Sequence, residues 1–205
     1  MSATDANSST RSATIERKTG ETDVSLSLGL DGRGEGTRRT GVGFFDHMLD
    51  LLARHAAIDL DLRVSGDLQT GAHHTAEDAA IVFGQALDEA LGDRARITRY
   101  GAATVPMDEA RASCAIDISG RPFTAFEAQL PPGATGGFDH ELAEEFFRSV
   151  ANAAKLTLHL RVEAGTNAHH MIEAAFKAFA RALRQAIALD PRETGVPSTK
   201  GTLTA

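Results

Sequence analysis

The sequence contains the pattern His-His-x-x-Glu twice, and these two pentapeptides carry the residue types best suited to chemistry. The first consists of residues 73–77 and the second of residues 169–173, and each is preceded by alanine. Imidazole nitrogens and carboxylate oxygens are both ligands for divalent transition metals. One His-His pair near a helix start is commonly only polar surface. Two copies with Glu at the same offset indicate two related metal sites.

If each pentapeptide opens a helix, its three ligand residues cannot easily serve one ion. Residues four apart project about 40° apart around a helix, whereas adjacent residues project about 100° apart. Glu77 can therefore share a face with one histidine of its pair, while the other points elsewhere. The same geometry applies to residues 169–173, so we expect two metals that receive ligands from both copies or from two subunits. Nitrogen and oxygen ligands without thiolate suit manganese, iron, zinc or cobalt, and the carboxylate content favours octahedral Mn(II).

Further ligands are expected on the helices that precede the two pentapeptides. His47 begins the first of these helices, and the matching position in the second half lies near Glu144 or Glu145. A carboxylate there is an acceptable ligand. His140 competes for the same role, whereas His159 lies in the middle of an expected strand and is better explained as structural.

The elements around the two pentapeptides repeat in the same order. A helical pattern over residues 44–57 leads into an alternating segment, a short loop and the first His-His-x-x-Glu helix, and residues 139–154 begin the same series. Both alternating segments end in Leu-Arg-Val, and the second pentapeptide begins 96 residues after the first. That offset is too long for a solenoid repeat and suits two duplicated half-domains.

These patterns predict an α/β (α+β) fold of internally duplicated half-domains. The strands alternate apolar and polar residues, which predicts two mostly antiparallel or mixed sheets with one buried face each. The helices show apolar residues at helical spacing, so we expect the two sheets to sandwich the helices, helix layer against helix layer. The expected divisions are a disordered N-terminus (1–12), half-domains (13–97 and 98–190) and a C-terminal arm (191–205). Further strands are expected at residues 14–19, 24–30, 98–105 and 112–118.

Composition excludes several classes of protein. The net charge of −7 disfavours general nucleic-acid binding. No apolar run approaches the roughly 18 residues that span a bilayer, and no signal peptide opens the chain. We therefore expect a cytoplasmic protein without a membrane partner. The single cysteine, Cys114, excludes an intrachain disulfide framework and is expected to be a small buried hydrophobe.

An ordered set of motifs extends this picture over nearly the whole chain. The motifs are residues 17–22, 40–49, 67–78, 107–110, 119–122, 167–178 and 195–201. Together they resemble the imidazoleglycerol-phosphate dehydratase family of histidine biosynthesis. The resemblance implies a ribosomal protein S5 domain 2-like fold, two Mn(II) ions per active site, and sites between the subunits of a homo-oligomeric 24-mer. It also implies dehydration of D-erythro-imidazole glycerol phosphate to imidazole acetol phosphate.

The same resemblance implies which residues of this chain bind metal. They are His47, His73, His74, Glu77, His169, His170 and Glu173. The family often has a further histidine in the first helix of the second half. That place holds Glu145 here, and Glu145 is expected to ligate in its stead. A second departure is Leu51, where many members carry Gln.

The reaction also needs a proton carrier and a cationic pocket for the phosphate. Once the ring is an imidazolate it can expel the side-chain hydroxyl, after which a base removes the neighbouring proton and the enol collapses to the ketone. Glu21 is the first choice as general acid/base, with Glu77 or Glu173 as further proton carriers. The residues expected to contact substrate are Glu21, His47, His55, His73, Arg99, Arg121, His169, Lys177, Ser198 and Lys200. Lys177 lies four residues after Glu173 on the same helical face, which independently places it near the metals.

Two alternatives remain open on the residues alone. One is a dinuclear metal hydrolase, and the other is a non-catalytic assembly in which metals only staple subunits together. Dehydratase activity that disappears with a chelator and returns with Mn(II) separates both from the dehydratase.

Overall fold

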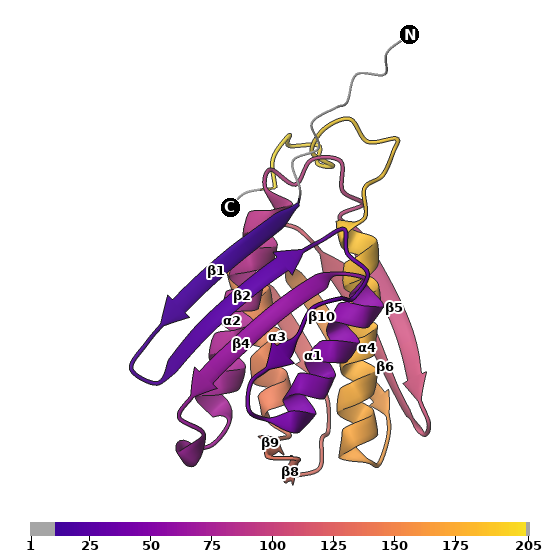
Figure 1. The fold of residues 1–205 in the computed structure, drawn as a ribbon. Coiled ribbons are helices and arrows are strands. Elements are labelled where there is room, and N and C mark those ends of the chain that lie inside the picture. The colour runs from indigo at the N-terminus through magenta and orange to yellow at the C-terminus, as the bar shows by residue number, and fades with distance from the viewer. Residues whose placement is uncertain (1–10, 204–205) are drawn as a thin grey trace.

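The chain folds as two half-domains with the same order of elements (Figure 1), and the structure, a computed structural model, describes residues 11–203. The first half comprises β1 (Ser12–Lys18), β2 (Thr22–Gly29), β3 (Arg38–Arg39), α1 (Gly43–Ala56), β4 (Asp59–Gly66), a 3-10 turn η1 (Leu68–Thr70) and α2 (His73–Leu91). The second comprises β5 (Tyr100–Met107), β6 (Ala110–Asp117), β7 (Phe123–Glu127), β8 (Ala134–Thr135), β9 (Phe138–Asp139), α3 (Leu142–Ala153), β10 (Thr157–Ala164) and α4 (Ala168–Ile187).

The two main sheets have identical topology. Their strand orders are β1-β2-β4-β3 and β5-β6-β10-β7. In each sheet the central pair is antiparallel and the fourth strand joins it in parallel. The register pairs Leu26 with Leu62 and Leu160 with Cys114, all buried, because alternate residues of a strand point to one face. The expected duplication and the buried Cys114 are thereby confirmed.

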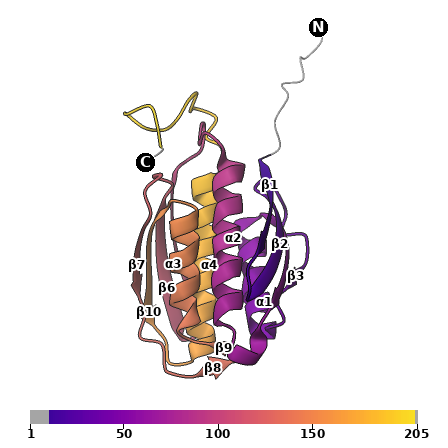
Figure 2. The ribbon, with the colours of Figure 1, turned by 90° about the vertical axis from the view of Figure 1, so that its left-hand side faces the viewer.

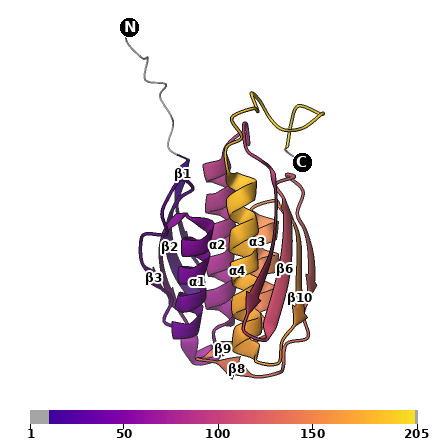
Figure 3. The ribbon, with the colours of Figure 1, turned by 90° about the vertical axis from the view of Figure 1, so that its right-hand side faces the viewer.

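The helices lie between the two sheets in two layers (Figures 2 and 3). Helix α2 packs on the first sheet and α4 on the second, while α2 contacts α3 and α1 contacts α4 across the middle. Phenylalanine rings fill this middle, with Phe146 centred 4.9 Å from Phe176 and 5.6 Å from Phe45. The expected sandwich of sheets around packed helix layers is therefore confirmed. In the described part of the chain, no helix has both the length and the apolarity of a membrane span.

Some element boundaries differ from the expected ones. Strand β1 begins at Ser12, one residue inside the segment expected to be disordered, and residues 1–10 of that segment lie outside the described residues. Strand β5 begins at Tyr100 and runs through Pro106, so the turn of the β5–β6 hairpin is only residues 108–109. Pro106 is tolerated because β5 is the edge strand of its sheet. The short strands β3, β7, β8 and β9 were not expected.

The C-terminal arm is anchored to the rest of the fold. The buried guanidinium of Arg94 donates to the carbonyl of Leu203 and pairs with Asp88. Leu203 is itself buried, and its carbonyl also lies against Gly120. The arm is therefore fixed beside the loop that follows β6, while residues 204–205 lie outside the described part.

A close approach of α2 to α3 makes a stability test possible. A Cβ atom built on Gly84 lies 2.6 Å from Ala153 Cβ and 2.8 Å from the Val150 carbonyl oxygen. Gly84→Ala should lower the free energy of unfolding by about 1–3 kcal/mol, because the helices must move apart to admit the methyl group. The control is Gly43→Ala in α1, where an added Cβ meets nothing within 4 Å. Urea denaturation that leaves both variants at the wild-type midpoint would contradict the close helix contact.

Candidate metal and substrate site

Helices α1, α2, α3 and α4 begin at the same end of the molecule, shown at the bottom of Figure 1. Their first two turns carry the histidine and glutamate residues of both pentapeptides together with His47 and Glu145. The β1–β2 and β5–β6 hairpin turns lie at this end as well (Figure 1). The repeated topology therefore gathers the expected ligands from both halves at one end.

Three of the expected ligands form a compact group, which we call the His47 cluster: His47 of α1 with His169 and Glu173 of α4. Their ligand atoms all lie within 4.8 Å of one another, and among residues 11–203 no other three His, Cys, Asp or Glu residues do so. Glu173 Oε2 is 3.1 Å from His169 Nε2 and 3.6 Å from His47 Nε2. Two imidazoles and a carboxylate at this spacing are the donor set of a divalent transition-metal site. The residues therefore fit the metal that the motifs imply.

The second oxygen of Glu173 is held by Lys177. The Lys177 ammonium lies 2.6 Å from Glu173 Oε1, as the four-residue spacing predicted. Burial by itself would raise the pKa of Glu173, which is only 5% exposed, but the hydrogen bond and positive charge of Lys177 act together with His169 and His47, and the pKa is lowered. Glu173 is thereby kept as a carboxylate that can accept a metal. His55 lies two turns beyond His47 on α1. Its pKa is lowered, mainly by burial and to a smaller extent by repulsion from Lys177.

The equivalent residues of the other half form a looser group, which we call the Glu145 cluster: Glu145 of α3 with His73 and Glu77 of α2. His73 Nε2 is 3.8 Å from Glu77 Oε2. Glu145 and His73 line one small surface pocket of about 190 Å³. The Ser149 hydroxyl donates to Glu145 Oε1 at 3.0 Å. The packing of α2 on α3 thus brings together the residues that correspond to the His47 cluster.

The second histidine of each pentapeptide is oriented by carboxylates of nearby turns. His74 Nδ1 lies 3.1 Å from both oxygens of Asp67, and its Nε2 is 3.7 Å from Glu21 Oε1. A histidine whose Nδ1 is hydrogen-bonded to a carboxylate presents Nε2 as the free ligand atom. The hydrogen bond with Asp67 raises the pKa of His74.

His170 is held in the same way in the other half. Its Nδ1 is 2.7 Å from Glu109 Oε2 and its Nε2 is 3.6 Å from Asp108 Oδ2. The hydrogen bond with His170, with backbone N–H groups of residues 166 and 167, lowers the pKa of Glu109 to about 2. The sequence motifs contained Asp67, Asp108 and Glu109, but their spacing gave them no role. Each contacts a histidine only because the fold brings its loop or hairpin turn next to a helix start.

Glu21 is placed by the contact between α2 and the β1–β2 hairpin. The buried Asp78 of α2 accepts a hydrogen bond from the Thr22 hydroxyl, one residue after Glu21. Glu21 itself is exposed, in the turn between the two strands. Its carboxylate lies beside the start of α2, 3.7 Å from His74 Nε2.

Apart from Lys177, the residues expected to bind phosphate lie at the opposite end of the folded molecule from the two clusters. The Arg99 backbone N–H donates to the carbonyl of Ala186 at the end of α4, whereas His169 is in the first turn of that helix. At 1.5 Å per residue this separates them by about 25 Å along the helix axis. The Arg99 guanidinium lies 2.7 Å from Asp117 and donates to the Pro197 carbonyl at 2.9 Å, which ties it to the C-terminal arm.

The other phosphate candidates share that end. Arg121 follows Gly120, which touches Leu203, and Ser198 and Lys200 are part of the arm, which Figure 1 shows at the top. The Lys200 N–H donates to the Ser198 hydroxyl oxygen at 3.2 Å. One chain therefore brings Lys177 to the His47 cluster but keeps Arg99, Arg121, Ser198 and Lys200 apart from both clusters, and His55 lies about 12 Å along α1 from His47.

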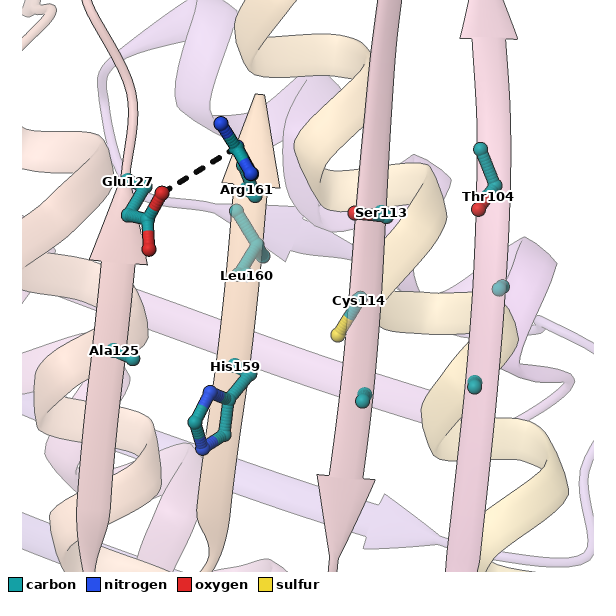
Figure 4. Close-up of a pocket in the computed structure, with 11 residues that line it drawn as sticks. Thr104, Ser113, Cys114, Ala125, Glu127, His159, Leu160 and Arg161 are labelled. Atoms are coloured by element: carbon teal, nitrogen blue, oxygen red, sulfur yellow. Dashed lines mark ion pairs between the residues drawn. The ribbon is translucent and has the colours of Figure 1, made fainter. Parts of the chain in front are cut away.

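A larger hollow, of about 440 Å³, lies on the outer face of the second sheet (Figure 4). Small side chains such as Ala102, Ala115 and Ala125 line it together with His159 and an Arg161–Glu127 ion pair of 3.4 Å. Of the described residues that line it, none belongs to the expected metal or substrate set. His159 is exposed on this face, away from both clusters. The hollow is therefore separate from the candidate site.

Comparison with known proteins gives a consistent result. Residues 40–183 match the family model described as imidazoleglycerol-phosphate dehydratase. The chain is similar to the proteins of that name from Symbiobacterium thermophilum (58% identity over 189 residues, 92% of this chain and 91% of the relative) and Jannaschia sp. (54% over 194 residues, 94% and 100%). A crystal structure of the Staphylococcus aureus protein of that name superposes with a TM-score of 0.80 at 41% identity, covering 87% of this chain and 99% of that one.

Proposed function

The chain belongs to the imidazoleglycerol-phosphate dehydratase family, and from this membership we propose that its ligand-bearing end dehydrates D-erythro-imidazole glycerol phosphate to imidazole acetol phosphate with two Mn(II) ions. As a member it is a hydro-lyase of histidine biosynthesis. Membership of this family argues against the two alternatives, a dinuclear hydrolase and a non-catalytic metal-stapled assembly. The single observation that carries the metal proposal is the His47 cluster, three ligand atoms within 4.8 Å.

The two clusters would each hold one ion. His47, His169 and Glu173 would hold the first, and Glu145, His73 and Glu77 the second. His74 and His170 are oriented by Asp67 and Glu109, which lie outside the pentapeptides, so they would be suited to complete sites on a neighbouring chain. When bound, Mn(II) acts as a Lewis acid that favours the imidazolate form of the substrate ring.

The chain's own residues would then move the protons. Glu21 is the general acid/base, since it is exposed at the ligand-bearing end and lies 3.7 Å from His74 Nε2. It removes the proton from the carbon adjacent to the one that loses its hydroxyl, so that one water leaves in total, and the enol that results becomes the ketone. Glu77 and Glu173 are second choices for proton transfer, because both lie within 4 Å of a histidine.

The proposed site is shared between chains. A phosphate ester bound at the ligand clusters needs cations, and within one chain Lys177 supplies one while the other candidates lie at the far end of α4. A neighbouring chain that presents its C-terminal arm to this end would add Arg99, Arg121, Ser198 and Lys200. A homo-oligomer, with 24 chains and a cytoplasmic location as the family resemblance implies, is therefore part of the proposal.

Metal removal tests the proposal directly. Incubation with a chelator should reduce turnover of imidazole glycerol phosphate to background, because the ring loses its Lewis acids, and added Mn(II) should restore it. Turnover is measured as formation of the ketone product, alongside metal content per chain. Mg(II) at the same concentration, a harder ion that keeps its waters, serves as the comparison. A folded, metal-loaded protein that does not turn over this substrate would refute the proposed reaction.

A further inference from the structure

The two ligand clusters occupy equivalent places in the duplicated fold. His47 and Glu145 each precede by ten positions a left-handed residue that ends the helix region, Ala57 with φ 55° and Lys155 with φ 56°. Each is followed, at the same distance, by the Leu-Arg-Val segment of a strand, β4 or β10. Helix α1 contacts α4 just as α3 contacts α2. The chemistry of one cluster can therefore be compared with that of the other, position by position.

With Lys177 counted beside the His47 cluster, the surroundings of the two clusters differ by two unit charges. The His47 cluster has one carboxylate, Glu173, whose second oxygen is 2.6 Å from the Lys177 ammonium. The Glu145 cluster has two carboxylates, because Glu145 stands where the other half has an imidazole. Four residues after Glu77, in the place that corresponds to Lys177, the chain has the half-buried Ile81.

Neighbouring groups do not cancel this difference. Arg148 lines the pocket that contains Glu145 but pairs with Glu144 on the same helix. Ser149 donates its hydroxyl to Glu145 Oε1 and leaves Oε2 available, whereas the corresponding residue in α1 is Leu51. The Glu145 cluster is therefore both more negative and richer in oxygen donors.

We propose that the two metal sites of this chain are unequal, with the Glu145 cluster as the tight site that fills first and the His47 cluster as the weaker, exchangeable site. This inference rests on the proposed two-metal function. Mn(II) favours carboxylate oxygen, and the Coulomb attraction of a divalent ion increases with each uncompensated negative charge beside it. The weaker site, next to Lys177, has the more positive net charge of the two sites and so attracts an anionic substrate more strongly.

Equilibrium titration of the full-length, chelator-stripped protein with Mn(II) tests this inference. Free Mn(II) is followed by electron paramagnetic resonance and binding heat by calorimetry. The wild type should show two classes of one ion per chain whose dissociation constants differ by at least about tenfold, a scale on which single contacts tune metal sites. Glu145→Gln should weaken the tight class by at least about tenfold and leave the other class unchanged.

A reciprocal variant and a matched control make the result specific. Lys177→Met removes the ammonium beside Glu173 and should tighten the weaker class several-fold. Glu141→Gln removes the same charge as Glu145→Gln from the same pocket lining and leaves the Arg148–Glu144 ion pair in place, so it should leave both classes unchanged. Circular dichroism of each stripped variant confirms that it is folded before titration.

The possible outcomes separate this inference from the proposed function. Two equal classes in the wild type, or a Glu145→Gln change confined to the weaker class, would overturn the inequality while leaving a two-metal dehydratase intact. Lack of any effect of Lys177→Met would likewise overturn it. A folded wild type that binds no Mn(II) would refute the two-metal function itself.

Discussion

Glu21→Gln is expected to lower kcat by about 10²- to 10⁴-fold, the usual contribution of a positioned general acid/base. The amide keeps the size and hydrogen-bonding reach of the carboxylate but cannot take the substrate proton. Glu21 lies in an exposed hairpin turn, and its neighbour Thr22 is fixed independently to Asp78. Metal content and assembly should therefore be unchanged. Steady-state kinetics with metal analysis of the same sample measures both.

A nearby carboxylate provides the control for this variant. Asp23, two residues further along the hairpin, pairs with Lys18 at 2.7 Å and points to solvent. Asp23→Asn removes the same charge from the same turn region and should retain nearly full activity. Full activity of Glu21→Gln would show that another group is the base. Loss of metal from Glu21→Gln would instead assign Glu21 to orienting His74, because its carboxylate lies 3.7 Å from that ring.

Subunit mixing should restore activity to a pair of inactive variants. His169→Asn disables the His47 cluster, and a double variant, Ser198→Ala with Lys200→Ala, disables the C-terminal arm, which should cost roughly 100-fold or more in activity. When the two are unfolded, mixed in equal amounts and refolded, some sites receive an intact cluster from one chain and an intact arm from another. Random assembly gives up to roughly a quarter of wild-type activity if each site takes one end from each of two chains.

The matched mixture combines two variants with damage at the same end. His47→Asn and His169→Asn each damage the His47 cluster, whose three residues all belong to one chain. No arrangement of the two kinds of chain therefore restores an intact cluster. This mixture should stay inactive. Native mass measurement establishes that both kinds of mixture contain hybrid oligomers. Hybrids of the cluster and arm variants that remain inactive would contradict a site shared between chains.

Periodicity predicted the parts of the fold that bury large surfaces. Both sheets, the four helices and the repeat were evident, because alternation and helical spacing record which residues face the core. Strands β3, β8 and β9, of two residues each, were missed because such short segments carry no alternation. Strand β7 was missed because neither of its faces is fully buried.

The sequence predicted the site less completely than the fold. The contact of Lys177 with Glu173 followed from spacing within one helix, and the structure confirms it at 2.6 Å. Roles for Asp67 and Glu109 could not be predicted, since both reach a histidine from a different element. The distance between Lys200 and His169 within one chain could not be predicted from the sequence either. A motif identifies a residue's type and order, but the direction of α4 decides at which end of the molecule it lies.

The placement of the arm and the clusters at opposite ends has a kinetic consequence. On the proposed arrangement an isolated chain carries both parts of an active site and yet has no complete one. The number of working sites then depends on the association equilibrium, so the rate per chain falls when the protein is diluted below its dissociation constant. The concentration of the protein enters the rate law twice, once as catalyst and once as its own activator.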